Sequence, residues 1–279
     1  MVTAAGSRES GKEFDFTVKD FERVRGLIYQ RAGISLSDSK QEMVYSRLAR
    51  RLRATGITSF SDYLDDLERG VDPDEWVAFT NALTTNLTSF FREEHHFPLL
   101  AEFATKLKDP MTVWCAASST GEEPYSIAIT LCEAFGKMSP PAKIVATDID
   151  TNVLGVGEDG VYNMDRLDKM SGERVKKFFL KGKGAHEGKV RVRPELRQMI
   201  EFKQLNLLSD SWPISGSFDA IFCRNVMIYF DKPTQKKILQ RFAPLLKPHG
   251  LLFVGHSENF SYLTDTFQLR GKTVYEFSR

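Results

Sequence analysis

The first ninety residues carry apolar positions at helical spacing. After residue 17 the apolar residues recur three or four positions apart, at Val18, Phe21, Val24, Leu27 and Ile28. Gly33 then provides a stop, and further helices are expected near residues 39–54, 59–70 and 72–86. The pattern predicts an all-α domain over residues 14–92, preceded by a disordered lead-in over residues 1–13.

The pattern changes after residue 93, where short apolar runs alternate with helical segments. The runs that read as strands are residues 112–116, 143–147, 200–205, 218–222 and 250–255. Such alternation predicts a mainly parallel sheet covered by helices, here an α/β domain over residues 93–279. The tail over 267–279 reads as an antiparallel edge hairpin around Arg270 and Gly271.

Residues 155–199 exceed what a crossover helix between two strands requires. The central segment KGKGAHEGKVRVR, residues 181–193, contains three glycines and alternates valine with arginine. We therefore predict an inserted β-subdomain at about residues 170–200. A surface hairpin without function is the plainer interpretation of this insert.

Composition excludes several classes of protein. The net charge of +1 across 279 residues gives no general affinity for nucleic acid. Cys115, Cys132 and Cys223 lie far apart, and no ligand spacing links the five histidines, so neither a metal site nor a disulfide framework is expected. Without a signal segment or an apolar run of membrane-spanning length, we expect a cytoplasmic protein with no direct membrane insertion.

The segment VWCAASSTGEEPYSIAI, residues 113–129, reads as strand, loop and helix, which is where a mononucleotide-binding unit holds its ligand. The loop has a single glycine, Gly121, and lacks G-x-G-x-x-G, so a dinucleotide dehydrogenase fits poorly. Glu122 and Glu123 would repel phosphate. Asp148, 27 residues after Gly121, is placed to accept hydrogen bonds from ribose hydroxyls. A nucleoside with a cationic end, S-adenosylmethionine, satisfies these features.

Five motifs together carry a resemblance to a known family. They are NLTSFFRE (86–93), AASSTGEEPYSIAI (116–129), ATDID (146–150), QLNLL (204–208) and FDAIFCRNVMIYFD (218–231). In this order they resemble the chemotaxis receptor methyltransferase (CheR) family, from about Phe14 to Phe277. The resemblance implies a Rossmann-like class I methyltransferase domain after the helical domain. It also implies methyl transfer from S-adenosylmethionine to glutamate side chains of chemoreceptors, with S-adenosylhomocysteine as product.

The resemblance also implies the cofactor-binding residues. They are Asn86, Thr88, Arg92, Glu123, Asp148, Asn206, Leu207, Arg224 and Asn225. Among these, Glu123 would face the methionyl ammonium, Asp148 would hold the ribose, and Asn206 with Leu207 would flank the adenine. Glu122 is assigned to the surface or to a place behind the cofactor-binding residues.

A glutamate acceptor is already ionised at neutral pH, so transfer needs no general base. Catalysis then rests on placing oxygen, methyl and sulfur in line. Arg92 and Tyr229 are the catalytic candidates that would orient the carboxylate. Arg92 would contact only one carboxylate oxygen, since a tight grip on both would weaken the nucleophile.

Two surfaces are candidates for receptor binding by a monomeric enzyme recruited to membrane receptor arrays. In the helical domain, Lys40, Arg47, Arg50 and Arg51 fall together on one arc of a helix, and Val44, Leu48 and Leu52 fall on another arc that should face the core. That face would meet the cytoplasmic helical region of chemoreceptors, or would merely be solvated. The resemblance also implies that the insert binds a receptor carboxyl-terminal tail peptide, as it does in some members of the family and not in others. Gly182, Gly184, Gly188 and Arg191 would then contact this peptide, added as a strand.

Two other functions stay open at this point. A related methyltransferase could act on a small acid or on RNA, although RNA requires a broader basic surface. A methyltransferase fold without activity could serve as an S-adenosylmethionine-binding scaffold, but such a protein has no physical need for Arg92, Glu123 and Asp148 together.

Overall fold

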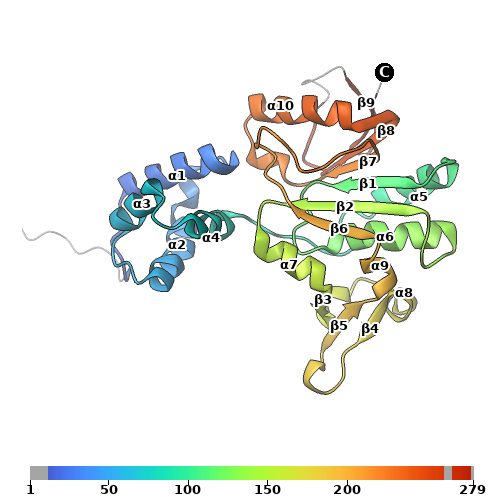
Figure 1. Ribbon diagram of the computed structural model, residues 1–279, viewed down its shortest axis with the longest axis horizontal. Helices are drawn as coiled ribbons and strands as arrows, with labels where there is room; N and C mark the ends of the chain where they lie inside the picture. Colours follow the sequence, from blue (N-terminus) through green and yellow to red (C-terminus); the bar gives the residue numbers. More distant parts are fainter. Residues whose placement is uncertain (1–11, 261–265, 278–279) are drawn as a thin grey trace, which may run out of the picture. The chain divides into compact units, whose positions relative to one another are not determined.

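The computed structural model describes residues 12–260 and 266–277 (Figure 1). The predicted lead-in thus lies outside the described residues, except for its last two positions. The chain divides into two compact units. The first holds the residues up to Gln30 and Leu36–Leu83, and the second holds Arg31–Ser35 and Thr84–Arg279.

The first unit is helical, as predicted. Its elements are α1 (Val18–Ala32, whose last two residues count with the second unit), a 3-10 turn η1 (Asp38–Lys40), α2 (Gln41–Thr55), α3 (Phe60–Arg69) and α4 (Pro73–Leu83). The Ser59 side chain accepts from the Asp62 N–H at the start of α3, and Gly70 ends that helix in a left-handed conformation. Val44, Leu48 and Leu52 are fully buried, which confirms the predicted core face of α2.

The second unit is built on a seven-stranded sheet in the order β6-β2-β1-β7-β8-β10-β9. The strands are β1 (Met111–Cys115), β2 (Ala142–Asp148), β6 (Ile200–Gln204), β7 (Phe218–Cys223), β8 (Leu246–Val254), β9 (Phe267–Gly271) and β10 (Val274–Phe277). The first five pair in parallel, and β10 and β9 form the predicted antiparallel edge hairpin. The α/β fold class and all five predicted strands are confirmed.

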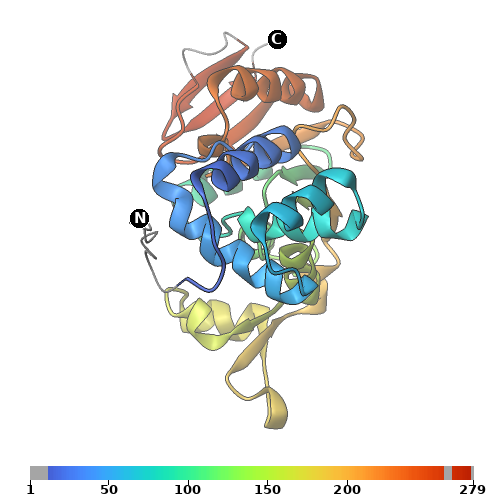
Figure 2. The same cartoon turned by 90° about the vertical axis from the view of Figure 1, so that its left-hand side faces the viewer.

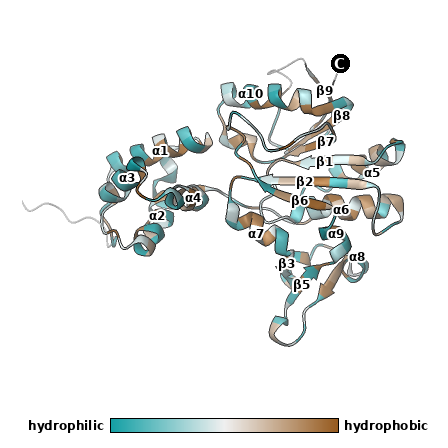
Figure 3. Cartoon of the chain, in the orientation of Figure 1, coloured by the Kyte–Doolittle hydropathy of each residue, from teal (hydrophilic) through white to brown (hydrophobic). Residues whose placement is uncertain are grey.

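Both faces of this sheet are covered, which explains why its strands read as continuous apolar runs. Val113 and Cys115 of β1 belong to the core on the side of α5 (His96–Lys106) and α6 (Glu122–Phe135). Trp114 and Ala116 belong to the core on the opposite side, with α10 (Lys232–Phe242). Figure 3 shows hydrophilic and hydrophobic residues in turn along α10, as expected of a helix with one face on a sheet.

A second, three-stranded antiparallel sheet follows the crossover helix α7 (Thr151–Asp159). Its order is β3-β5-β4, formed by β3 (Val161–Asn163), β4 (Phe179–Lys181) and β5 (Lys189–Val192). The 3-10 turn η2 (Met164–Leu167), α8 (Gly172–Phe178) and α9 (Pro194–Arg197) complete this part. We call residues 160–199 the insert. In both views the loop between β4 and β5 projects from the domain, on the side away from α10 (Figures 1 and 2). Within the described residues, no helix is long and apolar enough to span a membrane.

Candidate active site at the carboxyl edge of the sheet

The parallel strands deliver polar residues to one edge of the main sheet. Asp148 ends β2, Arg224 directly follows β7, and the loop over residues 116–121 follows β1. Because parallel strands have their carboxyl ends at the same edge, residues far apart in sequence converge there. Most of the predicted site residues meet at this edge.

The loop after β1 is shaped by its contacts with the protein. Ser118 N–H donates to the Thr147 carbonyl at 2.8 Å, and Gly121 adopts a φ of 96°. A side chain at Gly121 would place its Cβ 2.8 Å from Tyr162 Oη and 2.9 Å from Gly157 Cα. Glycine is therefore required for close packing against the insert and α7, independently of any ligand.

Asp148 is 8% exposed and holds this loop in place. Its carboxylate oxygens accept from the Ser119 N–H at 2.8 Å and from the Asp150 N–H at 3.0 Å. Burial raises the pKa of Asp148 to about 6, against the opposing effect of those two hydrogen bonds. A carboxylate has further lone pairs, so ribose hydroxyls remain possible partners.

Glu123 and Arg224 form a buried ion pair. Arg224 Nη1 lies 2.7 Å from Glu123 Oε2, and the two side chains are 1% and 11% exposed. The other Glu123 oxygen accepts from the Cys115 thiol at 3.1 Å. Burial, reinforced by Glu123, raises the pKa of Cys115, so the thiol is protonated and is no nucleophile.

Glu93 is the main residue that the sequence interpretation missed. Its carboxylate accepts from Asn225 Nδ2 at 3.1 Å and from the His256 N–H at 3.1 Å, with His256 Nδ1 at 2.9 Å. Arg224 Nη2 lies 3.4 Å from it. Burial opposes ionisation, but the hydrogen bonds from His256 and Asn225 and the charge of Arg224 lower the pKa of Glu93 to about 2. The sequence signal that could have identified Glu93 is its position directly after Arg92.

The segment over residues 84–93 brings three predicted residues to this edge. Asn86 Nδ2 donates to Asp150 at 2.8 Å, the Thr88 carbonyl accepts from Arg166, and Arg92 Nη1 donates to the Leu87 carbonyl at 2.8 Å. Arg92 lies in a turn before α5, where a helix start was considered. Thus Asn86 and Thr88 connect this segment to Asp150 and to the insert, and Arg92 is half-buried.

Asn206 and Leu207 follow β6, at the same edge. Asn206 donates to the Arg31 carbonyl at 2.7 Å and accepts from the Leu208 N–H at 2.9 Å. Leu207 is 6% exposed and packs in the core on the α10 side. Both side chains therefore have structural partners in the absence of any adenine.

Asn225 and Tyr229 follow β7. Asn225 has a φ of 57°, which is a left-handed conformation. Its backbone N–H donates to the Glu258 carboxylate at 2.9 Å, and this hydrogen bond maintains the conformation. Phe91, Glu93 and Ser119 also have positive φ, and strained backbone of this kind is common at functional sites. Tyr229 is half-buried in the 3-10 turn η4 (Met227–Tyr229), and its carbonyl accepts from the Ser35 N–H.

Glu258 is a second residue that sequence reasoning missed. It is 3% exposed, and its carboxylate accepts from the backbone N–H groups of Asn225, Met227 and Gly255 at 2.6–2.9 Å. Burial raises the pKa of Glu258 even though these donors favour the charged form. This carboxylate joins the ends of β7 and β8, and no pattern in the sequence distinguished it.

Glu122 requires a correction. The sequence left it at the surface or behind the cofactor-binding residues, but its side chain is 0% exposed and is paired with Arg166 of the insert. The surface assignment is wrong because an acid at the first turn of α6 lies beneath the insert. The insert therefore contacts the start of α6, beside the loop after β1.

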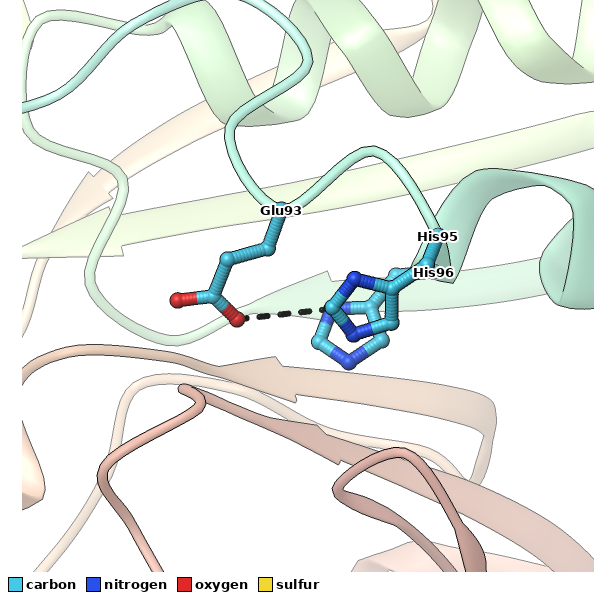
Figure 4. Close-up of side chains that lie close together, drawn as sticks. All are labelled: Glu93, His95 and His96. Atoms are coloured by element: carbon cyan, nitrogen blue, oxygen red, sulfur yellow. Dashed lines mark ion pairs between the residues drawn. The ribbon is translucent and has the colours of Figure 1, made fainter.

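Glu93, His95 and His96 place one potential ligand atom each within 4.8 Å of one another (Figure 4). The expectation that no ligand geometry links the histidines was therefore incomplete. His96 Nδ1 lies 3.9 Å from Glu93 Oε2, and burial lowers the pKa of His96 to about 4. However, Glu93 is already bound by Arg224, His256 and Asn225, so a metal ion would face a guanidinium. The arrangement of Glu93, His95 and His96 therefore favours a hydrogen-bonded network over a metal site.

The predicted receptor-binding residues have mixed environments. In the first unit Arg50 and Lys40 are exposed, but Arg51 binds Glu75 through two hydrogen bonds of 3.0 and 2.5 Å, and Arg47 donates to the Ala82 carbonyl. Of these four cations, Arg51 is therefore engaged within the first unit, whereas Lys40 and Arg50 face the solvent.

The predicted tail-peptide residues of the insert also have roles within the protein. A Cβ at Gly182 would lie 2.0 Å from the His186 carbonyl oxygen, while Gly184 and Gly188 have positive φ in the turn. Arg191 is exposed on β5, the central strand, and donates to the Asp159 carbonyl at 3.3 Å. The loop geometry alone therefore accounts for the three glycines.

The buried polar atoms near this edge that lack partners among the described residues include Ser118 Oγ in the loop and Arg224 Nε. Buried polar groups without partners are rare in folded proteins and are expected where a polar ligand completes the site. Together with the acidic pair Glu93 and Glu123, they fit a nucleoside with a cationic amino-acid end.

Comparisons with known proteins agree with this geometry. Residues 19–84 match the family model described as CheR methyltransferase, all-alpha domain, and residues 86–276 match CheR methyltransferase, SAM binding domain. The chain is 55% identical over 279 residues to chemotaxis protein methyltransferase 2 of Pseudomonas aeruginosa, covering 99% of each protein. It is 57% identical over 259 residues to the chemotaxis protein methyltransferase of Salmonella typhimurium, covering 93% of this chain and 90% of that protein.

Proposed function

The chain belongs to the CheR family of S-adenosylmethionine-dependent methyltransferases, and from this premise we propose that it methylates glutamate side chains of chemoreceptors, forming γ-methyl esters. The observation that carries the proposal is the match along nearly the whole chain to chemotaxis protein methyltransferases. The chemistry of the site agrees with an acceptor that is already anionic.

S-adenosylmethionine supplies an electrophilic methyl group on a sulfonium. We propose that the described residues at the site include no base that would deprotonate an acceptor. The thiols of Cys115 and Cys223 are buried with raised pKa, and His256 is engaged with Glu93. A glutamate carboxylate needs no such base, because it is ionised at neutral pH. We propose that Arg92 and Tyr229 orient that carboxylate and that Glu123, Asp148 and Arg224 hold the methyl donor.

The reaction is tested with labelled S-adenosylmethionine and a purified cytoplasmic receptor fragment. We expect label in the fragment that alkali releases as methanol, since esters hydrolyse in base and N-methyl groups do not. Asp148→Ala should weaken S-adenosylhomocysteine binding by about 1–3 kcal/mol, roughly tenfold to a hundredfold. Alkali-stable label would contradict the ester, and unchanged affinity of Asp148→Ala would contradict the ribose contact.

We also propose that the insert binds a carboxyl-terminal receptor peptide and thereby recruits the monomeric enzyme to receptor arrays. The free edges of the small sheet are β3 and β4, and the β4 residue Leu180 is 41% exposed. An extended peptide could pair with β4, and tethering would raise the local enzyme concentration around its substrate.

Arg191 offers a cation to an acidic residue or carboxylate of such a peptide. Arg191→Ala should weaken the affinity for receptor tail pentapeptides, measured by calorimetry, without altering cofactor binding. Arg197→Ala is the matched control, since both arginines donate to carbonyls at the end of α7. If no tail peptide from the host's receptors binds the wild-type chain, peptide docking is excluded.

A further inference from the structure

The insert contacts two of the segments that form the candidate cofactor site, namely segment 84–93 and the loop after β1 with the start of α6. Tyr162 Oη on β3 donates to the Thr120 carbonyl at 2.7 Å, within the loop after β1. Arg166 in η2 donates through Nη2 to the Thr88 carbonyl at 3.0 Å and is also paired with the Glu122 carboxylate. One arginine of the insert therefore joins segment 84–93 to the amino end of α6.

Glu122 makes this link specific. Its side chain is 0% exposed, and its second oxygen accepts from Thr120 Oγ1 at 2.6 Å. A buried carboxylate is tolerated only when charges and hydrogen bonds compensate it. Arg166 supplies the cation, and the several donors of a guanidinium allow it to bind Thr88 at the same time.

Another ion pair links the insert to the far end of α6. Arg174 of α8 binds Glu133 through two hydrogen bonds of 2.8 Å, and these side chains are 39% and 32% exposed. Both arginines thus tie the insert to one helix. Both also reach segment 84–93, which carries Arg92: the Arg174 guanidinium lies over the Phe91 ring, 4.4 Å from its centroid, whereas Arg166 hydrogen-bonds the Thr88 backbone. The residue that Arg166 binds on α6, Glu122, is adjacent to Glu123.

We propose that Arg166 is a positioning residue of the methyl-transfer site. It fixes segment 84–93 against the start of α6, so that Glu123 and Arg92 keep the spacing that the methyl donor requires. The inference rests on the proposed binding of S-adenosylmethionine at this edge. The insert is then part of the active-site framework, whether or not it also binds a receptor peptide.

The test compares Arg166→Ala with Arg174→Ala in the full chain. S-adenosylhomocysteine affinity is measured by calorimetry, methyl transfer by label incorporation, and stability by thermal unfolding. Arg166→Ala should weaken affinity at least tenfold, whereas Arg174→Ala should change it less than twofold. Arg166→Lys should be intermediate, because an ammonium supplies the charge without the planar set of donors.

Arg166→Ala leaves a buried charge and could unfold the domain, so a double variant separates stability from positioning. Arg166→Met with Glu122→Gln removes both charges and should restore the unfolding temperature without restoring affinity. Wild-type affinity in the double variant, or equal losses in the Arg166→Ala and Arg174→Ala variants, would overturn the positioning role. Failure of the wild-type chain to bind S-adenosylhomocysteine would instead overturn the proposed function on which the inference rests.

Discussion

Arg224 lies between two carboxylates, with Nη1 2.7 Å from Glu123 and Nη2 3.4 Å from Glu93. Counted as formal charges, two acids and one guanidinium leave an excess of one negative charge. A cationic group nearby would be attracted by this excess, most strongly where water is excluded. The cluster thus reconciles a buried arginine with a site that holds a sulfonium and an ammonium.

Removing Arg224 should destabilise the second unit. Arg224→Met leaves Glu93 and Glu123 buried without their shared cation, and breaking a buried pair in this way costs about 3–5 kcal/mol. Urea unfolding measures the loss. The exposed Arg174–Glu133 pair serves as control, since Arg174→Ala should cost no more than about 1 kcal/mol. If Arg224→Met lowered the free energy of unfolding as little as Arg174→Ala does, the ion pairs of Arg224 would contribute little to stability.

Glu123→Gln should distinguish the amino-acid end of the cofactor from its nucleoside. The substitution keeps the size of the side chain but cancels the excess negative charge. S-adenosylhomocysteine affinity should fall by about 1.5–3 kcal/mol, the range for hydrogen bonds to charged groups. Methylthioadenosine, which lacks the amino-acid part, should bind both proteins alike. A similar loss for both ligands would place Glu123 away from the ammonium.

Asp148 should impose a pH dependence on stability. Its pKa is raised from 3.8 to about 6, so the native state binds more protons than the unfolded state within that window. Stability is therefore lost as pH rises from about 4 to 6, by about 3 kcal/mol in total at 1.36 kcal/mol per unit. An asparagine side chain in its place has no proton to lose and should remove this dependence.

Urea unfolding at pH 4, 5, 6 and 7 measures the effect of Asp148→Asn. The difference in unfolding free energy, variant minus wild type, should increase by about 2.4 kcal/mol from pH 4 to pH 7. The exposed residue Asp109 supplies the control, Asp109→Asn, whose difference should stay constant. A constant difference for Asp148→Asn would show that its pKa is close to the ordinary value.

The strands were predictable because most of their residues are apolar on both faces, as in Phe218–Cys223, where all six residues are buried and five are apolar. Asp148 could be proposed as a site residue from its position at the carboxyl end of such a strand, whereas Arg224 was proposed from the family resemblance. The side chains with which the site residues pair were not predictable from the sequence. Arg166 and Glu122 are 44 residues apart, and Glu93 and His256 are 163 apart, so their pairing depends on how the insert and β8 pack. Local patterns carry no information on such pairs.

Arg92 and Tyr229 should affect turnover more than binding. Arg92→Ala or Tyr229→Phe should lower kcat for receptor methylation by at least about tenfold, a 1.4 kcal/mol loss of transition-state placement. The affinity for S-adenosylhomocysteine should change less than the rate. The Arg92→Lys variant keeps the positive charge without the guanidinium and therefore serves as the control for the effect of charge alone. Full activity of Tyr229→Phe would show that its hydroxyl has no part in the transfer.

Arg50 and Arg51 should behave differently although they are neighbours on α2. Arg51 binds Glu75, which also accepts from Tyr63 Oη at 2.7 Å; burial and this bond raise the pKa of the Tyr63 phenol. Arg51→Glu would oppose Glu75 and should lower the stability of the first unit by about 1.5–3 kcal/mol.

Arg50 is exposed, so Arg50→Glu should leave stability unchanged. If this face meets acidic receptor helices, Arg50→Glu should raise KM for the receptor fragment about twofold to fivefold at low salt. This increase in KM should vanish near 1 M salt, where the electrostatic screening length is about 3 Å. Lys40→Glu provides a second exposed position on the same face. Unchanged KM at low salt for both variants would mean that the basic face of α2 only solubilises the helical unit, and that receptor specificity resides elsewhere in the chain.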